Sequence, residues 1–402
     1  MHGGRSMTVK VLMVAPRYYP YLGGFERQAH TLSKRLVQLG VDVSVVTGRH
    51  DATLPVYEEQ DGVKIHRLPS ADTALGRGLT FTPSLAKFLI VNRHRYDVLH
   101  VHTFGWYLLG VMPLAKMFCL PVLLKLPNVG ESGLPGLRAR KGGSLLLRLV
   151  KAASAFVAMS EESVDELHAE GIENSHILLN TNGVDTTVFN PLQSDIEKNA
   201  LRKRLSLPNG KIVLFTGRLT AQKGLIDLLS IWPYILKEAP SSHLVLCGSG
   251  EQEYELRQLI RCTDAEQTVH FVGDVGSPVD YYRASDLLAH PSYVEGNSNS
   301  ILEAMACGLP LVSTIAGGTP MLVGRAGREY LVTPGDRQAL ADAILTLLES
   351  NDKAKRLSAA LVERTHNALS IDVVARHYHE CYKLLAAEEY DKVGGLSNRL
   401  TY

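Results

Sequence analysis

A polar loop between two carboxylates, Glu295 and Glu303, is the segment of the chain best suited to chemistry. Seven residues separate the two glutamates, and the first of them are Gly296, Asn297, Ser298 and Asn299. A loop of this kind at the start of a helix presents backbone N–H groups to an anion. Carboxylates nearby accept hydrogen bonds from hydroxyl groups. The segment therefore predicts a binding site for a sugar joined to phosphate.

Glu303 also fits a purely structural role. Ser300 precedes it by three residues, which is the spacing of a capping box, where a glutamate bonds back to the backbone of the N-cap serine. Glu295 has no such alternative, so it is the firmer candidate for ligand binding.

A second loop, residues 216–224, carries two cations at the end of a predicted strand. Arg218 can hold phosphate with a bidentate fork, and Lys223 adds a point charge. Together they could neutralise a diphosphate leaving group without a metal ion. The structural alternative is an ordinary basic surface loop. The glycines on both sides of the cations argue against this alternative.

Two further candidates lie in the first half of the chain. Gly23 and Gly24 precede a predicted helix that starts near Phe25, where they let a ligand approach the backbone or serve only a turn with positive φ. His100 and His102 lie on the same side of a predicted strand. His102 is at the carboxyl end, where ligands bind in parallel α/β sheets, so we expect His102 to be functional and His100 to be structural.

The elements that must position these residues follow an alternating pattern. Short apolar runs alternate with helical patterns, which predicts an α/β protein with parallel sheets. A chain of 402 residues fits two domains, and the pattern restarts after a break near residue 190. We expect a first domain at 1–190, a second at 191–370, and a C-terminal helical segment at 371–402. The G-x-G-x-x-G fingerprint of a dinucleotide-dependent oxidoreductase is absent after the first strand.

Composition and charge exclude several classes of protein. The net charge of +1 argues against a nucleic-acid binder, and no 18-residue run is free of both charge and proline, which argues against a membrane span. Five scattered cysteines lack metal-binding spacing and predict a cytoplasmic protein with reduced thiols. Residues 64–151 carry thirteen Lys or Arg and only three acids. Such a basic face suits an anionic membrane or a phosphorylated acceptor, or it is a solvated surface.

Taken in order, these motifs resemble the family 4 retaining glycosyltransferases of GT-B fold. The resemblance covers residues from about 10 to 345. The motifs that carry it are Gly23-Gly24, His100-Val101-His102, Asn182-Gly183-Val184-Asp185, Gly217-Arg218, Lys223-Gly224, and Glu295 followed after seven residues by Glu303-Ala304-Met305-Ala306-Cys307-Gly308.

The resemblance implies a fold and a role for each motif. Two Rossmann-like domains would face each other across a cleft, the first binding the acceptor and the second binding a nucleoside-diphosphate sugar. Arg218 and Lys223 would hold the diphosphate, and Glu303 the ribose. Glu295 and the N–H groups of residues 297–299 would contact the sugar and its phosphate. Gly23, Gly24 and His102 would act from the first domain, and the last helix would cross back to it.

The resemblance also implies the reaction. The chain would transfer a hexosyl or N-acetylhexosaminyl group from a UDP- or GDP-sugar to a hydroxyl, with retention and with no metal ion or other cofactor. We expect an anionic or lipid-linked acceptor in polysaccharide or glycolipid assembly, and peripheral membrane contact through residues 64–151. Two departures are Asn297-Ser298-Asn299, where many relatives have Phe-Gly, and Met321, where many have Glu. A non-catalytic nucleotide-sugar binder and an epimerase or phosphorylase on the same architecture remain alternatives.

Overall fold

The computed structural model describes residues 8–397 apart from 22, 72 and 262, and it divides the chain into two compact units. The first unit contains the chain as far as Gly183 together with the segment that starts at Ile371. The second unit contains Val184–Ser370. The boundary predicted at residue 190 therefore lies inside the second unit.

The first unit is built on an eight-stranded sheet. All neighbouring strands pair in parallel except the edge pair β3–β4, which is antiparallel. In spatial order the strands are β3 (Tyr57–Gln60), β4 (Val63–Pro69), β2 (Asp42–Arg49), β1 (Lys10–Val14), β5 (Val98–Val101), β6 (Val122–Leu126), β7 (Ala155–Ala158) and β8 (Ile177–Leu179).

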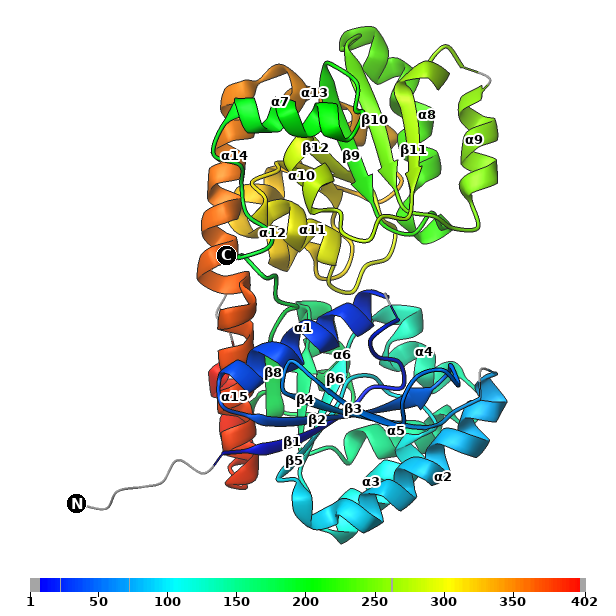
Figure 1. Ribbon diagram of the computed structural model, residues 1–402, viewed down its shortest axis with the longest axis vertical. Helices are drawn as coiled ribbons and strands as arrows, with labels where there is room; N and C mark the ends of the chain where they lie inside the picture. Colours follow the sequence, from blue (N-terminus) through cyan, green and yellow to red (C-terminus); the bar gives the residue numbers. More distant parts are fainter. Residues whose placement is uncertain (1–7, 22, 72, 262, 398–402) are drawn as a thin grey trace, which may run out of the picture. The chain divides into compact units, whose positions relative to one another are not determined.

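Helices cover both faces of this sheet, because successive side chains of its strands point to opposite sides. The sheet therefore has a hydrophobic core on each face. Val11 and Met13 of β1 belong to the first core, and Leu12 and Val14 belong to the second. The first core is closed by α1 (Gly24–Gln38) and α15 (Ile371–Ala386). The second is closed mainly by α2 (Ala74–Asn92), α3 (Leu108–Met117), α4 (Leu134–Ala139), α5 (Gly143–Lys151) and α6 (Glu161–Ala169) (Figure 1).

The second unit is built on a six-stranded, fully parallel sheet. Its strands, in spatial order, are β11 (Val269–Gly273), β10 (Ser242–Cys247), β9 (Lys211–Thr216), β12 (Leu287–His290), β13 (Leu311–Thr314) and β14 (Leu331–Val332). Its helices are α7 (Asp195–Arg204), α8 (Leu225–Glu238), α9 (Glu253–Arg261), α10 (Val279–Ala284), α11 (Asn299–Ala306), α12 (Thr319–Gly327), α13 (Arg337–Glu349) and α14 (Asn351–Arg364).

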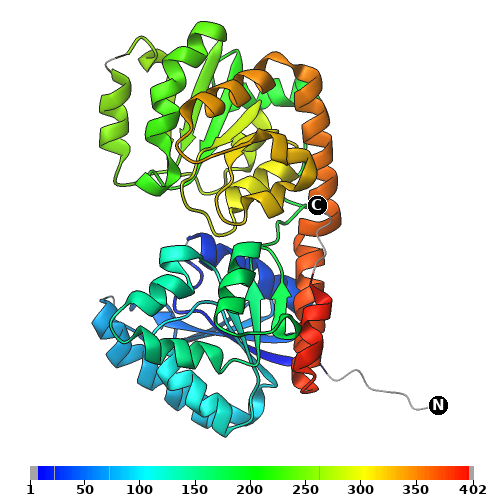
Figure 2. The ribbon, with the colours of Figure 1, turned by 180° about the vertical axis from the view of Figure 1, so that it is seen from behind.

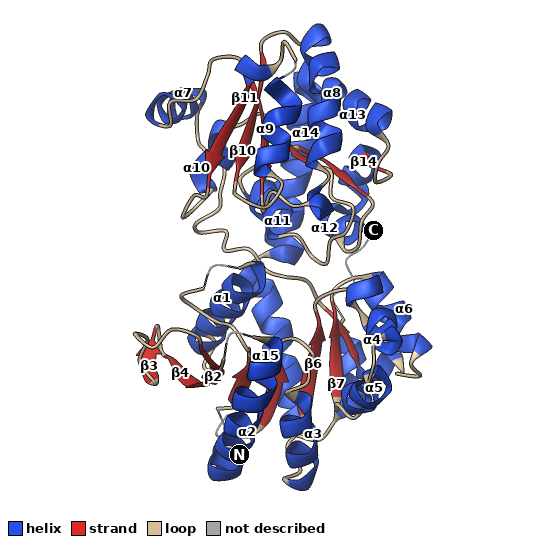
Figure 3. Cartoon of the chain, turned by 90° about the vertical axis from the view of Figure 1, so that its right-hand side faces the viewer, coloured by secondary structure: helices blue, strands red, loops and turns tan. Residues whose placement is uncertain are grey.

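The same layering is visible from other directions. In each unit the strands form a central layer with helices on both sides (Figures 2 and 3). The prediction of an α/β protein with two parallel sheets is therefore confirmed. In the described part of the chain, no helix is long and apolar enough to cross a membrane.

Each sheet has a point where the chain order of its strands reverses. In the first sheet this point lies between β1 and β5, and in the second it lies between β9 and β12. Ligands of doubly wound sheets bind outside the carboxyl ends of the strands at such a reversal. The loops that follow these four strands are therefore the places where a binding site is expected.

Candidate functional site

The second unit brings two predicted loops together at its strand reversal. The loop after β9 carries Arg218 and Lys223, and the loop after β12 carries Glu295. The two loops are joined directly, because the backbone N–H of Tyr293 donates to the carbonyl oxygen of Gln222 at 2.8 Å. Residues predicted from separate motifs thus share one edge of one sheet.

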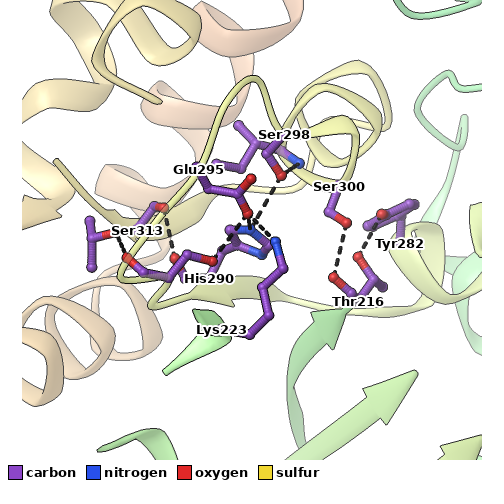
Figure 4. A network of polar contacts seen from close by, with 11 residues as sticks. Thr216, Lys223, Tyr282, His290, Glu295, Ser298, Ser300 and Ser313 are labelled. Carbon is purple, nitrogen blue, oxygen red and sulfur yellow. Dashed lines mark hydrogen bonds and ion pairs between the residues drawn. The ribbon is translucent and has the colours of Figure 1, made fainter. Parts of the chain in front are cut away.

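Glu295 is the centre of a polar cluster that we call the Glu295 cluster, formed by Lys223, His290, Ser292 and Glu295. One carboxylate oxygen of Glu295 is ion-paired with Lys223 Nζ, lies 2.8 Å from His290 Nε2 and accepts a hydrogen bond from Ser292 Oγ at 3.1 Å (Figure 4). Glu295 is 9% exposed. The structure therefore places Glu295 and Lys223 in direct contact.

The charges in the Glu295 cluster belong to Glu295 and Lys223. Burial alone would raise the pKa of Glu295, but the hydrogen bond from His290 and the charge of Lys223 outweigh it and lower this pKa to about 2. Burial lowers the pKa of His290, so His290 is neutral near pH 7. Its Nε2–H then donates to Glu295, and Lys223 supplies the positive charge.

Gly224 explains how Lys223 reaches this position. Lys223 ends a short 3₁₀ turn, Ala221–Lys223, and Gly224 follows in the left-handed region with φ of +67°. A Cβ atom at Gly224 would lie 2.1 Å from the carbonyl oxygen of Pro291. Only glycine permits this approach of the two loops without strain, and the approach sets Lys223 beside Glu295.

Gly317 and Gly318 support the Glu295 segment from a third loop, between β13 and α12. The N–H of Gly318 donates to the carbonyl oxygen of Gly296 at 2.8 Å. Gly317 has φ of +50°, and a Cβ atom there would lie 1.7 Å from the carbonyl oxygen of Glu295. This loop therefore braces the backbone that carries Glu295.

Replacing Gly317 by alanine is expected to displace Glu295. The substitution combines strain at positive φ, about 1–3 kcal/mol, with a steric conflict against the Glu295 backbone. A shift of about 1 Å in a positioning group can cost about 100-fold in rate, so we expect a loss of that order. Steady-state kinetics and thermal denaturation would measure both effects.

Gly273→Ala is the matched control for this prediction. Gly273 has φ of +81°, but a Cβ atom there would meet nothing within 4 Å. It should lose only the stability that the strain at positive φ costs, while retaining activity. Equal activity of Gly317→Ala and Gly273→Ala would contradict the bracing role.

The remaining predicted donor-binding residues lie around the same edge. The side chain of Arg218 is exposed and forms no hydrogen bond or ion pair with any residue that the structure describes. Ser298 is buried, accepts a hydrogen bond from the N–H of Ile301 at 3.5 Å and lies 3.2 Å from His290 Nε2. Asn297 and Asn299 are partly exposed. Helix α11 begins at Asn299 with no acid in its first turn, so its N-terminus favours an anion.

Glu303 belongs to a second polar cluster. It accepts a hydrogen bond from the Tyr282 hydroxyl at 2.9 Å, and Tyr282 lies 2.7 Å from Thr216 Oγ1. Ser300 Oγ donates to the carbonyl oxygen of Thr216 at 2.9 Å, so the cluster joins α11 to the end of β9 (Figure 4). The N-cap of α11 is Ser298, so Ser300 lies inside the helix. The capping-box alternative for Glu303, with Ser300 as N-cap, is therefore wrong.

Removing the Tyr282 hydroxyl is expected to weaken donor binding by about tenfold. Tyr282→Phe deprives the buried Glu303 carboxylate of a donor, and a hydrogen bond to a charged group contributes about 1.5–3 kcal/mol. The dissociation constant of the nucleoside diphosphate, measured by calorimetry, would show the change. Tyr330→Phe, at another buried tyrosine of the same unit, should leave this constant unchanged; an unaltered constant in Tyr282→Phe would remove the proposed role of this cluster.

The first unit places His102 directly after β5. His102 is buried, its ring stacks on His100 with centroids 4.1 Å apart, and its Nε2 has no hydrogen-bond partner among the described residues. Burial, and then the charge of Lys125, lower the pKa of His102 to about 3, so it is neutral. His100 instead bonds to the Tyr382 hydroxyl of α15 at 2.7 Å, which fits the structural role predicted for it.

Gly23 and Gly24 lie at the start of α1, after β1. Gly23 is the N-cap with φ of −74°, and neither glycine has positive φ. The alternative in which these glycines serve only a turn with positive φ is therefore wrong. They follow one strand of the reversal in the first sheet, and His102 follows the other.

Two buried polar residues of the sheets, His290 and Lys125, were not predicted from the sequence. His290 ends β12; the carboxyl-end position that singled out His102 would also have found it. Lys125 lies within the buried strand β6, where its Nζ donates to Asn182 Oδ1 at 3.1 Å and where burial lowers its pKa to about 8. It has no carboxylate partner in the part of the chain described here.

No group of three or more His, Cys, Asp or Glu side chains among the described residues is arranged to hold a metal ion. Metal independence remains a prediction.

Comparison with known proteins gives two family matches. The model of the family described as "Glycosyl transferases group 1" matches residues 197–363, and the model of "Glycosyltransferase Family 4" matches residues 22–188. The D-inositol 3-phosphate glycosyltransferase of Xylanimonas cellulosilytica is 28% identical over 394 residues, which cover 89% of this chain and 92% of that protein.

Solved structures show the same fold. The sucrose-phosphate synthase of Thermosynechococcus elongatus matches with a TM-score of 0.79 and 22% identity, over 94% of this chain and 100% of that one. HepE of Anabaena, solved in complex with UDP-glucose, matches with a TM-score of 0.75 and 24% identity, over 93% and 99% of the two chains. The expected GT-B fold is thereby confirmed.

Proposed function

Because this chain belongs to the family 4 glycosyltransferases of GT-B fold, we propose that it transfers a sugar from a nucleoside-diphosphate sugar to a hydroxyl acceptor. The observation that carries the proposal is the Glu295 cluster at the strand reversal of the second unit, with the Arg218 loop and the N-terminus of α11. The UDP-glucose bound in the solved structure of HepE supports a nucleotide sugar as donor.

The proposed roles follow from the charges of these residues. Glycosyl transfer develops negative charge on the departing diphosphate, and fixed cations stabilise that charge more in the transition state than in the ground state. Arg218 and Lys223 would contact the diphosphate, with the N–H groups of residues 297–299. Glu295 would accept hydrogen bonds from the sugar hydroxyls, and it would hold Lys223 in place between turnovers.

The remaining roles rest on the family likeness. Glu303, fixed by Tyr282, would accept hydrogen bonds from the ribose, and the first unit would bind the acceptor. Gly23 and Gly24 would contact the diphosphate, and neutral His102, with its unpaired Nε2, would hydrogen-bond the reacting sugar. We propose transfer of a hexosyl or N-acetylhexosaminyl group from UDP or GDP with retention of configuration, within polysaccharide or glycolipid assembly.

The compartment proposed for this reaction is the cytoplasm. The four described cysteines, Cys119, Cys247, Cys307 and Cys381, are free thiols, and thiols stay reduced there. Nucleoside-diphosphate release from a panel of UDP- and GDP-sugars, with hydroxyl acceptors supplied, tests the proposal. NMR of the product would report its anomeric configuration.

Two results would instead support a non-catalytic binder or an epimerase. Tight donor binding in calorimetry without any turnover would support a non-catalytic binder, for which the Asn297-Ser298-Asn299 segment is the motivating departure. Conversion of the nucleotide sugar without an acceptor would support an epimerase. Arg257→Ala, on the exposed face of α9, is a control that should turn over donor at the rate of the unaltered protein.

Chelation is expected to leave the rate unchanged. Arg218, Lys223 and the N-terminus of α11 supply positive potential where a divalent ion would otherwise be needed. The same assay with excess EDTA, and with added Mg²⁺ or Mn²⁺, measures this. A rate that falls with EDTA and returns with metal would overturn metal independence while leaving the transferase proposal intact.

A further inference from the structure

Four consecutive helices of the first unit contain no acidic residue. Neither Asp nor Glu occurs in α2, α3, α4 or α5, whereas the next helix, α6, opens with Glu161 and Glu162. The four helices form a continuous layer on one face of the sheet, since α2 contacts α3, α3 contacts α5 and α5 contacts α4. Figure 1 shows α2 and α3 side by side in this layer.

The outward side of this layer carries large apolar side chains. The inward side is already buried against the sheet, through residues such as Leu85, Val111 and Leu146. On the opposite side Val91 is 71% exposed, Leu79 69% and Met117 62%. The other large apolar side chains exposed there are Ile90, Trp106, Leu109 and Leu145. Trp106 lies against Gly142, the residue before α5, so it connects the start of α3 with α5.

Exposed cations lie on the same helices as these apolar side chains, or between α4 and α5. None of the following five forms an ion pair with a residue that the structure describes: Lys87, Lys116, Arg140, Lys141 and Arg148. Four other basic residues of segment 64–151 do not contribute to this surface. Arg67 and Lys125 are buried, Lys64 pairs with Asp42, and Arg138 pairs with Glu170. The basic face predicted from thirteen residues is therefore smaller than the sequence suggested.

We propose that this surface, which we call the acid-free surface, docks onto a lipid bilayer with anionic headgroups. It consists of Leu79, Lys87, Ile90, Val91, Trp106, Leu109, Lys116, Met117, Arg140, Lys141, Leu145 and Arg148. The proposal does not depend on the reaction proposed above. It defines residue by residue a membrane contact that the sequence indicated only as a basic segment.

The combination of charges and apolar groups selects a membrane as the partner. Apolar side chains on a basic helical face enter the boundary between headgroups and acyl chains, while Lys and Arg contact anionic lipid. Tryptophan is enriched at this boundary because its ring is amphipathic. A nucleic acid would satisfy the cations but not the exposed apolar side chains, and an apolar protein partner would not explain the lack of acids in the four helices.

The chain contains its own reporter for this contact. It has two tryptophans, Trp106 and Trp232, and Trp232 is fully buried in the second unit. Emission that changes on addition of vesicles therefore comes from Trp106. With equimolar phosphatidylcholine and phosphatidylglycerol at low salt, we expect the emission to shift to shorter wavelength and the protein to sediment with the vesicles. Both effects should weaken as salt is raised and be absent with phosphatidylcholine alone.

Variants separate this surface from the rest of the protein. Lys116→Glu with Arg148→Glu should lower partitioning onto anionic vesicles more than tenfold, because each basic residue near such a surface contributes about fivefold. Leu109→Glu with Leu145→Glu should have a comparable effect. The matched control is Ile196→Glu with Tyr254→Glu, two exposed apolar positions of the second unit, and it should bind vesicles as the unaltered protein does.

Three results would overturn the proposal. They are equal binding to neutral and anionic vesicles, equal binding by the charge variant and the control, and sedimentation with no change in Trp106 emission. Donor turnover in detergent-free buffer should be unchanged in the Lys116→Glu and Arg148→Glu variant. Loss of vesicle binding with normal turnover supports the docking surface, whereas vesicle binding without any turnover refutes only the proposed reaction.

Discussion

Replacing Glu295 by glutamine is expected to lower kcat/KM for donor turnover by two to three orders of magnitude. Glutamine keeps the volume of the side chain but removes the charge that holds Lys223 and accepts hydrogen bonds from His290 and Ser292. Removing one preorganised group of this kind costs about 2.7–4 kcal/mol of transition-state stabilisation. Initial rates of nucleoside-diphosphate release across donor concentrations would give the ratio.

A control must separate this effect from the general loss of an ion-paired carboxylate. Asp286 of the same unit pairs with Lys198 and Arg202 away from the Glu295 cluster. Asp286→Asn should reduce stability and leave kcat/KM within about threefold. If Glu295→Gln retains the activity of Asp286→Asn, the assignment of Glu295 is wrong.

The pH dependence of stability offers a second measurement of the same group. The pKa of Glu295 is lowered from its ordinary 4.5 to about 2, so the folded protein holds the ionised form more readily than the unfolded chain does. This contribution is complete above pH 4.5 and is lost as the pH falls towards 2. Glu295→Gln should therefore lose less stability than the unaltered protein across that interval, measured by denaturant titration at each pH.

Replacing Lys223 by methionine is expected to cost a similar factor in rate, and the two losses should not add. Methionine keeps the aliphatic length but removes the charge proposed to contact the diphosphate. Neighbours that act through one contact show coupling energies of about 0.5–3 kcal/mol. The double variant with Glu295→Gln should thus lose less than the product of the two single losses.

The coupling can be tested with the charge kept. Lys223→Arg preserves the ion pair with Glu295 and should retain more activity than Lys223→Met. Binding of free UDP or GDP, measured by calorimetry, should weaken in Lys223→Met but much less in Glu295→Gln, which retains the cation. Strict additivity of the two losses, or unchanged diphosphate binding without the lysine, would contradict this arrangement.

The main candidate residues could be predicted because position in a parallel sheet limits where chemistry can occur. Arg218, Lys223 and Glu295 follow strands whose apolar runs are clear in the sequence, and the carboxyl ends of such strands lie at one edge. The pairing of Lys223 with Glu295 could not be predicted, since it depends on two glycines, Gly224 and Gly317, whose neighbours are distant in sequence.

Other features have weaker signals. The antiparallel edge β3–β4 lacks the continuous apolar run that marks the buried strands: β3 has a single apolar residue, and in β4 apolar residues alternate with polar ones. Ser298 and Ser300 are both reasonable N-caps by type, and only the structure shows that the helix begins at Asn299. Lys125 lies inside an apolar strand. The sequence alone does not show whether a buried lysine has a carboxylate partner.

The discontinuity of the first unit has a consequence for how the protein is made. Helix α15 covers one core of the sheet, with Ile371, Val374, Tyr378 and Tyr382 against residues such as Val11 and Val43. A ribosome adds about 5–20 residues per second, so the segment Val184–Ser370 takes about 10–40 s to synthesise. During that interval the first unit has all its strands but lacks α15, the helix that covers one face of their sheet. The second unit is contiguous and can complete first, which reverses the usual order in which the N-terminal domain of a nascent chain matures.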